Sequence, residues 1–293
     1  MVKFLSSKSY DDPGHNHGDC ILIDTGAELI VFDCGSEAHA NRVLEYAKQK
    51  GYQELSIILS HNDDDHFNGI PILLDNIKVK AIYTHLLLKY KNDILDLISD
   101  QRRNLNSIGE SIVNAYSNIA SLSGYPLKDA FVDKQVSIGV QIIGPDKDYV
   151  LAAVAKGIDS REGDSIDKET ITNATSLHVS VNLGNQRLLL CGDSPFPPLE
   201  EILPCYVHVQ LPHHGKPSTA EQIFDANGSR NVRYYISDNT GNSNGGCQNN
   251  RYYGHYVKNT LFNGDFICEE FNANFGHGLK PTGCLGCLHA GSN

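Results

Sequence analysis

Short apolar runs alternate along the chain with stretches in which apolar residues recur at helical spacing. The apolar runs predict strands at residues 20–23, 28–32, 55–60, 79–84, 136–143, 177–183, 187–191, 206–211 and 234–237. The first two are separated by Asp24, Thr25 and Gly26, which are typical of a hairpin turn. Strands that alternate with helices, through hairpins as well as crossovers, predict a mixed α/β layered fold.

Helical spacing is clearest at residues 38–50, where the apolar stripe ends at Gly51, a residue typical of the position after a helix. A second, shorter helix is expected at 70–74. Residues 86–123 form a longer helical stretch rich in Leu, Ile and Asn, without a cluster of titratable groups. We expect this stretch to be a helical insertion that covers a sheet or rims a pocket.

The amino-acid composition is consistent with the predicted α/β fold. The chain has 293 residues, of which 40% are hydrophobic and 20% charged, values typical of a globular protein. We expect a single domain over residues 1–293, with a tail rich in Cys, Gly and Asn from about residue 240. The 24 basic residues against 35 acidic ones give a net charge of −11, which disfavours a dedicated duplex-DNA binder.

The location and the cysteines can also be predicted. No run approaches the ~18 apolar residues of a membrane helix, and the N-terminal residues lack the apolar core of a signal peptide, so we expect a cytoplasmic protein without membrane insertion. Cysteines within strand-like runs (Cys20, Cys34 and Cys191) are expected to be reduced. For the tail cysteines (Cys247, Cys268, Cys284 and Cys287), a structural zinc site, a disulfide and free thiols all remain open.

Candidate chemistry is concentrated directly after the predicted strand 55–60. His61, Asp63, Asp65 and His66 lie within six residues. Carboxylates and imidazoles crowded so closely favour a divalent cation between them, and nitrogen plus oxygen donors suit Zn²⁺, Mn²⁺ or iron. The alternative is an acidic, solvated turn, because Asn and Asp are also common in turns.

Three further segments favour the metal site. The strand at 187–191 is followed by Asp193, and the strand at 206–211 by the adjacent His213 and His214. His255 follows Gly254 after a glycine-rich stretch. Each of these residues alone is compatible with a structural role, but their joint occurrence after strands predicts a shared site.

These motifs together resemble a known family. They are Gly18 to Ile23, Phe32 to Gly35, Ser60 to His66 with Gly69, Asn173 with Ser176 and Leu177, Leu188 to Asp193, Leu211 to Gly215, and Tyr253 to His255. In this combination, which spans most of residues 14–260, the chain resembles the metallo-β-lactamase fold superfamily, and in particular its ComEC-like branch. The resemblance implies an αββα sandwich with a metal site at the edge between two sheets.

The resemblance also implies roles for the motif residues. His61 and Asp63 would hold one metal, with Asp63 standing where most of the superfamily has histidine. Asp65, His66 and His255 would hold the second metal, and Asp193 would bridge both. The superfamily's remaining histidine for the first metal falls near Asn173, where this chain has no imidazole. His213 or His214 is expected to fill this gap, while the other stays free to protonate a leaving group.

Two divalent ions, Zn or Mn, are therefore the expected cofactors. Such a pair lowers the pKa of a water towards ~7, and Asp65 is a candidate to orient that water. His213 and His214 are the general-acid candidates, because histidine exchanges protons near neutral pH. Asp19 and Asp33 are expected behind the ligands or in turns. His15 and His17 are candidates for substrate contacts at the mouth of the site.

The expected activity is that of a metal-dependent hydrolase. The resemblance favours a phosphodiesterase or nuclease, and the negative charge favours a small-molecule or short, single-stranded nucleic-acid substrate. Two alternatives remain: a hydrolase of a small ester, phosphocholine-like or lactam, and a non-catalytic partner subunit that keeps the fold. A protein partner and the oligomeric state are left open.

Overall fold

The computed structural model describes residues 1–6, 18–159, 165–237 and 254–268. The strands are β1 Val2–Phe4, β2 Ile21–Asp24, β3 Leu29–Phe32, β4 Glu54–Ile58, β5 Lys78–Thr84, β6 Leu127–Asp129, β7 Gln135–Ser137, β8 Val140–Gly144, β9 Ser165–Ile166, β10 Glu169–Thr170, β11 His178–Leu183, β12 Gln186–Leu190, β13 His208–Gln210, β14 Arg233–Ile236, β15 Tyr256–Asn259 and β16 Phe266–Ile267. The helices are α1 Glu37–Lys50, α2 Asp64–Phe67, α3 Ile70–Asn76, η1 Leu87–Tyr90, α4 Lys91–Leu97, α5 Leu105–Ala115, α6 Ser117–Ser121, α7 Lys147–Ile158, α8 Ile171–Ala174, α9 Pro197–Glu200, η2 Leu203–Cys205, α10 Pro212–Gly215, α11 Pro217–Asn227 and α12 Thr260–Asn263.

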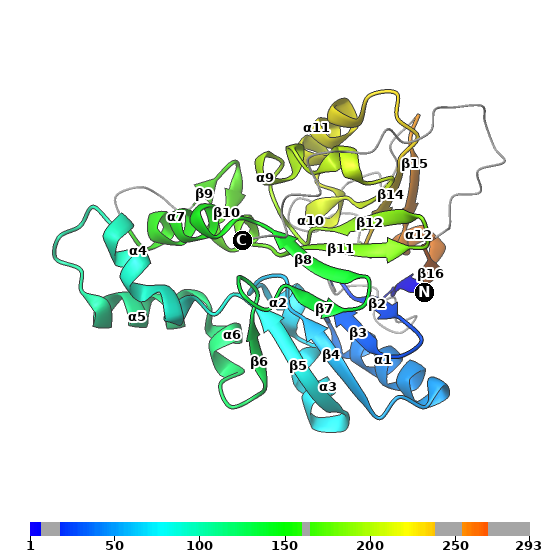
Figure 1. The fold of residues 1–293 in the computed structure, drawn as a ribbon, viewed down its shortest axis with the longest axis horizontal. Coiled ribbons are helices and arrows are strands. Elements are labelled where there is room, and N and C mark those ends of the chain that lie inside the picture. Colours follow the sequence, from blue (N-terminus) through cyan, green and yellow to red (C-terminus); the bar gives the residue numbers. More distant parts are fainter. Residues whose placement is uncertain (7–17, 160–164, 238–253, 269–293) are drawn as a thin grey trace.

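Two mixed sheets form the centre of the molecule (Figure 1). The first has the strand order β16-β1-β2-β3-β4-β5-β6, and the second has the order β15-β14-β13-β12-β11-β8-β7. In the first sheet β3 to β6 are parallel, and in the second β12 to β15 are parallel. The carboxyl ends of neighbouring parallel strands share one edge, and this edge is where functional side chains gather in open α/β sheets.

Alternating side chains along the strands divide the apolar interior into three layers. In β3, Leu29 and Val31 pack with the helices outside the first sheet, whereas Ile30 and Phe32 belong to the cluster between the sheets. In the second sheet, Leu189 packs on the opposite side, in the cluster that includes residues of α11. Burying each such side chain stabilises the fold by about 1.5–3 kcal/mol. The protein is therefore an αββα sandwich, as the sequence predicts.

The first long helix forms where helical spacing predicts it. The Ser36 side chain accepts a hydrogen bond from the His39 backbone N–H and caps the start of α1. Gly51 ends the helix with a φ of 78°, a left-handed conformation that glycine adopts without a steric penalty. The start and the end of this element are thus encoded locally.

The predicted helical insertion at 86–123 is confirmed as η1, α4, α5 and α6. Asn104 caps α5 in a reciprocal arrangement with Ser107. Ile94, Ile108 and Ile112 of the insertion share the outer apolar cluster with residues of α7. The insertion helices α4 and α5 extend away from the sheets, while α6 lies beside β6 (Figure 1).

Some elements differ from the sequence prediction. The single strand expected at 136–143 is a hairpin of β7 and β8, which turns at Gly139 with a φ of 79°. β1, β6, α7 and α11 are additional to the predicted elements. β1 and β6 have only three residues each, whereas α7 and α11 have buried residues at helical spacing.

The cysteines and the membrane prediction are tested only in part. Cys20, Cys34 and Cys191 are buried free thiols, which confirms the reduced state expected for them. Cys268 is also buried, and its Sγ lies 3.5 Å from His208 Nδ1. Cys247, Cys284 and Cys287 lie outside the described residues, so the three alternatives for the tail cysteines stay open. Within the described ranges, every helix is too short or too polar to cross a membrane.

Candidate metal centre

The motif after β4 forms one wall of the site. The chain leaves β4 at Ile58, and the loop that follows carries His61 and Asp63. The next residues form the one-turn helix α2, so Asp65 and His66 lie on a helical turn. Gly18 packs against this turn, and a Cβ atom there would lie 1.5 Å from the Asp65 carbonyl oxygen.

The second sheet supplies the opposite wall. Asp193 follows β12, and His213 and His214 follow β13 in the short helix α10. Both histidines have left-handed backbones, with φ of 51° and 53°. Such a conformation costs about 1–3 kcal/mol for a side chain with a Cβ, and it persists only where neighbouring structure enforces it. A hydrogen bond from the His213 N–H to the Gly192 carbonyl, 3.2 Å long, ties the two strand ends together.

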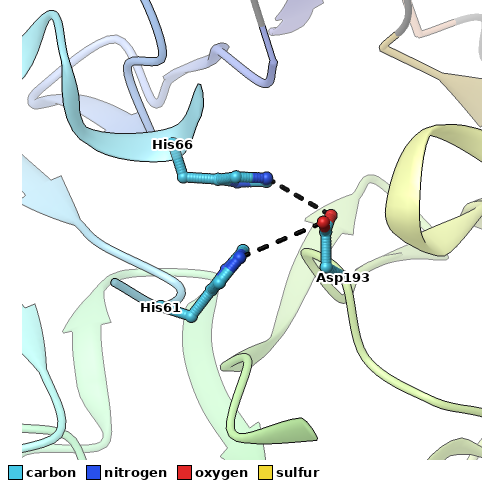
Figure 2. A group of neighbouring side chains, drawn as sticks. All are labelled: His61, His66 and Asp193. Carbon is cyan, nitrogen blue, oxygen red and sulfur yellow. Dashed lines mark ion pairs between the residues drawn. The ribbon is translucent and has the colours of Figure 1, made fainter. Parts of the chain in front are cut away.

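The carboxylate of Asp193 lies at the centre of the cluster and is 3% exposed. Its Oδ1 is 3.3 Å from His66 Nε2, and its Oδ2 is 4.0 Å from His61 Nε2 (Figure 2). Oδ2 is also 3.8 Å from His213 Nε2. One carboxylate therefore faces imidazoles from both sheets, with its two oxygens turned to different partners.

Two groups of side chains lie around this carboxylate. On the Oδ2 side, His61 Nε2 is 3.7 Å from Asp63 Oδ2. On the Oδ1 side, Asp65 joins the cluster: its Oδ1 is 4.0 Å from His66 Nε2, and its Oδ2 is 2.9 Å from His214 Nε2. The structure thus brings together seven of the predicted site residues, which are His61, Asp63, Asp65, His66, Asp193, His213 and His214.

Each of the four imidazoles is held from behind through Nδ1. His61 Nδ1 lies 2.9 Å from Ser60 Oγ, and His66 Nδ1 lies 2.8 Å from Asp33 Oδ2. The remaining two Nδ1 contacts are from His213 to Glu169 Oε2, at 2.9 Å, and from His214 to the Ser237 carbonyl, at 2.7 Å.

These outer contacts fix which ring nitrogen faces the cluster. Carboxylate and carbonyl oxygens only accept, and the Ser60 hydroxyl donates to Asp33, so in each case Nδ1 is the donor. The Nε2 lone pair of each neutral imidazole is then available towards the centre. Metal-binding histidines are typically oriented in this way.

Electrostatics in the cluster depend on charge pairing rather than on burial alone. Burial lowers the pKa of His66, but Asp193, Asp65 and Asp33 raise it well above its usual value overall. Burial raises the pKa of Asp193, but the neighbouring imidazoles, His66 first, hold it well below the usual range overall. The carboxylates thus stabilise positive charge at the centre, whether as protons or as a metal ion.

The donor set fits a divalent metal. Among the described residues, His61 Nε2, His66 Nε2 and Asp193 Oδ1 are buried polar atoms without a hydrogen-bond partner. The ligand atoms of His61, His66 and Asp193 lie within 4.8 Å of one another, as do those of Asp65, His66 and His214. Two donors on one tetrahedral Zn²⁺ lie roughly 3.3 Å apart, close to the shortest of the Asp193 contacts.

His255 is not part of this cluster, which corrects the prediction that it completes the second metal site. Its exposed ring stacks on Phe224 with centroids 3.9 Å apart. The reason is topological: β14 and β15 are parallel, and His255 precedes β15, whereas the cluster residues follow their strands. His214 lies beside Asp65 and His66, where His255 was expected.

The predictions for residues around the proposed ligands have different outcomes. Asp33 is confirmed as a support behind His66, and Asp19 Oδ1 lies 3.6 Å from His214 Nδ1. Asn173 lies behind His213, with Nδ2 3.4 Å from Nδ1, and does not reach the centre. His15 and His17 lie outside the described residues.

Sequence reasoning missed Glu169 and Ser237. Glu169 is buried, contacts His213 and forms an ion pair with Lys216, whose Nζ is 2.6 Å from Oε1. Its only signal in the sequence is its place four residues before Asn173. Ser237 acts through its backbone carbonyl, which leaves no signal in the sequence at all.

A family model described as the metallo-beta-lactamase superfamily matches residues 13–227. The chain belongs to the metallo-β-lactamase superfamily. Members of this superfamily are metal-dependent hydrolases. No curated protein matches the chain in sequence.

Several solved structures are similar to this superfamily member. Hydrolase AbOPH of the beta lactamase superfamily is 17% identical with a TM-score of 0.31, and the match covers 61% of this chain but only 56% of that protein. The short form of human tRNase Z is 12% identical, with coverages of 77% and 88% and a TM-score of 0.35. A motif mutant of the Cronobacter sakazakii metallo-beta-lactamase is 13% identical, with coverages of 80% and 75% and a TM-score of 0.35.

Proposed function

We propose that this protein is a phosphodiesterase that uses two divalent metal ions, Zn or Mn, to cleave small or single-stranded phosphodiester substrates. The observation that carries the proposal is the position of Asp193, whose Oδ1 faces His66 and whose Oδ2 faces His61 and His213. A carboxylate in this position suits a bridge between two ions. Paired ions stabilise both the attacking and the leaving oxygen of an in-line displacement at phosphorus.

The proposed ligand sets follow the two groups around Asp193. His61, Asp63 and His213 would hold the first ion, and Asp65, His66 and His214 would hold the second. When bound, the ions would supply a hydroxide-like nucleophile at neutral pH and polarise the phosphoryl oxygens. Asp63 has the most exposed carboxylate of the cluster, at 36%, so the first ion would be the more open to substrate.

His213 and His214 are proposed as ligands rather than as general acids. Both rings turn Nε2 towards carboxylates of the cluster, and their Nδ1 atoms are occupied by Glu169 and by Ser237. Neither ring is therefore placed to protonate a leaving group. Asp65, whose Oδ2 lies 2.9 Å from His214 Nε2, remains the candidate to orient the nucleophile.

The substrate class is proposed from charge and motif. A net charge of −11 opposes extended binding of a polyanion, so contacts to substrate would concentrate at the ions and favour short substrates. We place the chain in the ComEC-like branch of the superfamily. The basis is the motif from Ser60 to His66, with Asp63 where most members have histidine.

Activity assays on purified protein loaded with Zn²⁺ or Mn²⁺ test the proposal. The substrates are bis(p-nitrophenyl) phosphate, a short single-stranded DNA, p-nitrophenylphosphorylcholine and a chromogenic β-lactam. Turnover of the first two, lost in a His61→Ala, Asp65→Ala double variant together with bound metal, supports the proposal.

Asp64→Asn is the matched control, because Asp64 lies between two proposed ligands but is exposed and bonds to Asn118. It should keep both metal and activity. Hydrolysis of the ester or lactam alone would replace the phosphodiesterase assignment. Phosphodiester turnover that persists in the double variant would remove the proposed site.

A further inference from the structure

The insertion helices α5 and α6 are separated by a break in the helical hydrogen-bond pattern. Tyr116, between them, has φ and ψ of −121° and 46°, which lie outside the helical region. The pattern is regular on both sides: the Tyr116 N–H donates to the Ile112 carbonyl and the Ala120 N–H donates to the Tyr116 carbonyl, each at 2.9 Å. A continuous helix would also join the Ile119 N–H to the Ala115 carbonyl, four residues earlier.

The side chain of Asn62 takes the place of this hydrogen bond. Asn62 lies between His61 and Asp63 on the loop that joins β4 to α2. Its Oδ1 accepts from the Ile119 N–H at 3.1 Å, and its Nδ2 donates to the Ala115 carbonyl at 3.3 Å. The asparagine amide offers an acceptor and a donor side by side, as a peptide group does. Insertion of a side chain between helical backbone groups is one of the common causes of a sharp kink.

Asn62 is held by its main chain as well as by its side chain. It is only 8% exposed, so its amide requires hydrogen-bond partners in the folded protein. Asn118 Nδ2 donates to the Asn62 carbonyl at 2.7 Å and also to Asp64 Oδ1 at 3.0 Å. Three hydrogen bonds therefore attach the residue between His61 and Asp63 to the insertion.

Asp65 and His66, the next proposed ligands along the chain, are attached to a different part of the fold. The Asp65 carbonyl accepts from the Asp19 N–H at 3.1 Å, and the His66 carbonyl accepts from the Cys34 N–H at 2.9 Å. Asp19 precedes β2 and Cys34 follows β3, so these contacts belong to the first sheet. Within this stretch of chain, the insertion anchors the ligands proposed for the first ion, whereas the sheet anchors those proposed for the second.

Asp63 depends on its main chain for its position. Its carboxylate is 36% exposed and makes no capping hydrogen bond to α2, although Asp63 stands at the start of that helix. Consecutive Cα atoms are about 3.8 Å apart across a trans peptide, so a fixed residue confines the residue on either side of it. Asn62 therefore limits where the side chains of both His61 and Asp63 begin.

We propose that Asn62 is a positioning residue for the metal centre: by replacing a helical hydrogen bond at the break between α5 and α6, it lets the insertion fix His61 and Asp63 around the first ion. The proposal rests on the proposed function, which supplies the two ions, and adds to it a role for the insertion. Ligands that are fixed before the ion arrives bind it without the cost of ordering the loop.

Stepwise release of Zn²⁺ to a chromogenic chelator tests this role without any reaction. His61→Ala, which removes a proposed ligand of the first ion, identifies the step that belongs to that ion. Asn62→Ala should weaken the affinity for the first ion by about 10–100-fold, the typical range for partners that orient a ligand, and leave the affinity for the second ion unchanged. Asn114→Ala, at an exposed position of α5 next to Ala115, is the matched control and should equal the wild type.

Asn118→Ala gives a second variant in case Asn62→Ala disturbs folding. It removes the contact to the Asn62 carbonyl but leaves the Asn62 side chain in the helix break. The affinity for the first ion should fall in the same direction as in Asn62→Ala, but by less.

Amide hydrogen exchange at Ile119, followed by NMR, tests the same link from the side of the insertion. Coupling between two sites is reciprocal, so ions that hold the β4–α2 loop should also hold Asn62 in the helix break. In the wild type, Zn²⁺ should slow exchange of the Ile119 N–H by a factor similar to the loss of affinity in Asn62→Ala. In Asn62→Ala, Zn²⁺ should not change this exchange rate. The Tyr116 N–H, bonded within α5 to Ile112, is the internal reference.

The outcomes separate this proposal from the proposed function. Equal loss of affinity for both ions in Asn62→Ala, or unchanged affinity for the first ion in both Asn62→Ala and Asn118→Ala, overturns the positioning role. Exchange at Ile119 that does not respond to Zn²⁺ in the wild type also overturns it. If the loss is specific to the first ion but no phosphodiester is hydrolysed, the proposed function fails and the positioning role stands.

Discussion

Buried histidines occur in two chemically different environments in this protein. His66, His213 and His214 face carboxylates, and despite burial, which lowers it, the pKa of each is raised overall. Burial instead lowers the pKa of His85 to about 4 and that of His178 to about 3. The same residue type thus favours the charged form in one place and the neutral form in the other.

The difference lies in what surrounds each ring. Asp193 and Asp65 lie within 4.0 Å of cluster imidazoles, whereas His178 Nε2 bonds to the Ser194 hydroxyl at 2.9 Å. A neutral hydroxyl does not offset the cost of burying a charge, but a carboxylate does. Histidine burial alone is therefore no sign of a metal site; burial together with facing carboxylates is.

Removing the Asp193 carboxylate, which both groups of cluster histidines face, should have the largest effect on the metal cluster. Asp193→Asn keeps the shape but removes the charge that both histidine groups face, so we expect loss of both bound ions and a fall in activity of more than about 100-fold. Metal content by mass spectrometry and turnover with the best substrate are the measurements. Asp225→Asn, an exposed carboxylate on α11, should match the wild type, and retention of two ions by Asp193→Asn would refute the bridging role.

Removing an outer support should have a smaller effect. Glu169→Gln weakens the contact that orients His213, and such partners typically contribute 10–100-fold to metal affinity. We expect one of the two ions to be released more easily to a chelator, while the other is retained. Glu221→Gln on the exposed face of α11 is the control, and equal affinity of both variants for both ions would exclude a positioning role for Glu169.

The buried, neutral state of His85 predicts that the free energy of unfolding depends on pH. Unfolded histidine has a pKa of about 6.5, whereas that of buried His85 is about 4, so between these values the unfolded chain binds more protons. Stability therefore falls as pH decreases through this window, by about 2 kcal/mol between pH 7 and pH 5 for His85.

The cluster histidines act with the opposite sign in metal-free protein, because their pKa values are raised. Denaturant unfolding of metal-free His85→Phe and of wild type at both pH values isolates the His85 contribution. The variant should lose less stability than the wild type on acidification. Equal losses would show that His85 is not buried in its neutral form.

The smallest effect is expected at His255. His255→Ala removes a ring that stacks on Phe224 and contacts Tyr234, a change on the order of 1 kcal/mol. Metal content and kcat/KM should not change, and only the melting temperature should fall slightly. A loss of metal in this variant would return His255 to the ligand set.

The sequence predicts those parts of the site whose residues are close together in the chain. His61 to His66 form one compact motif after an apolar strand, and Asp193 directly follows another. These features need no knowledge of which strands pair. The strand and helix patterns predict a mixed α/β layered fold, and the αββα sandwich follows from the family resemblance. β3 is a continuous apolar run, so its sequence does not show that its side chains divide between two apolar clusters.

The parts that the sequence could not predict depend on pairing and on direction. The position of His255 is set by the parallel register of β14 and β15, which brings the start of β15 beside the start of β14. Glu169 reaches His213 across 44 residues. The division between His213 and His214 depends on their left-handed backbone, which gives the two neighbouring rings different partners.

Anomalous diffraction from crystals grown with Zn²⁺ tests the two-ion site most directly. We predict two peaks, one among His61, Asp63 and His213 and the other among Asp65, His66 and His214, with Asp193 between them. A single peak, or peaks only outside this cluster, would contradict the account.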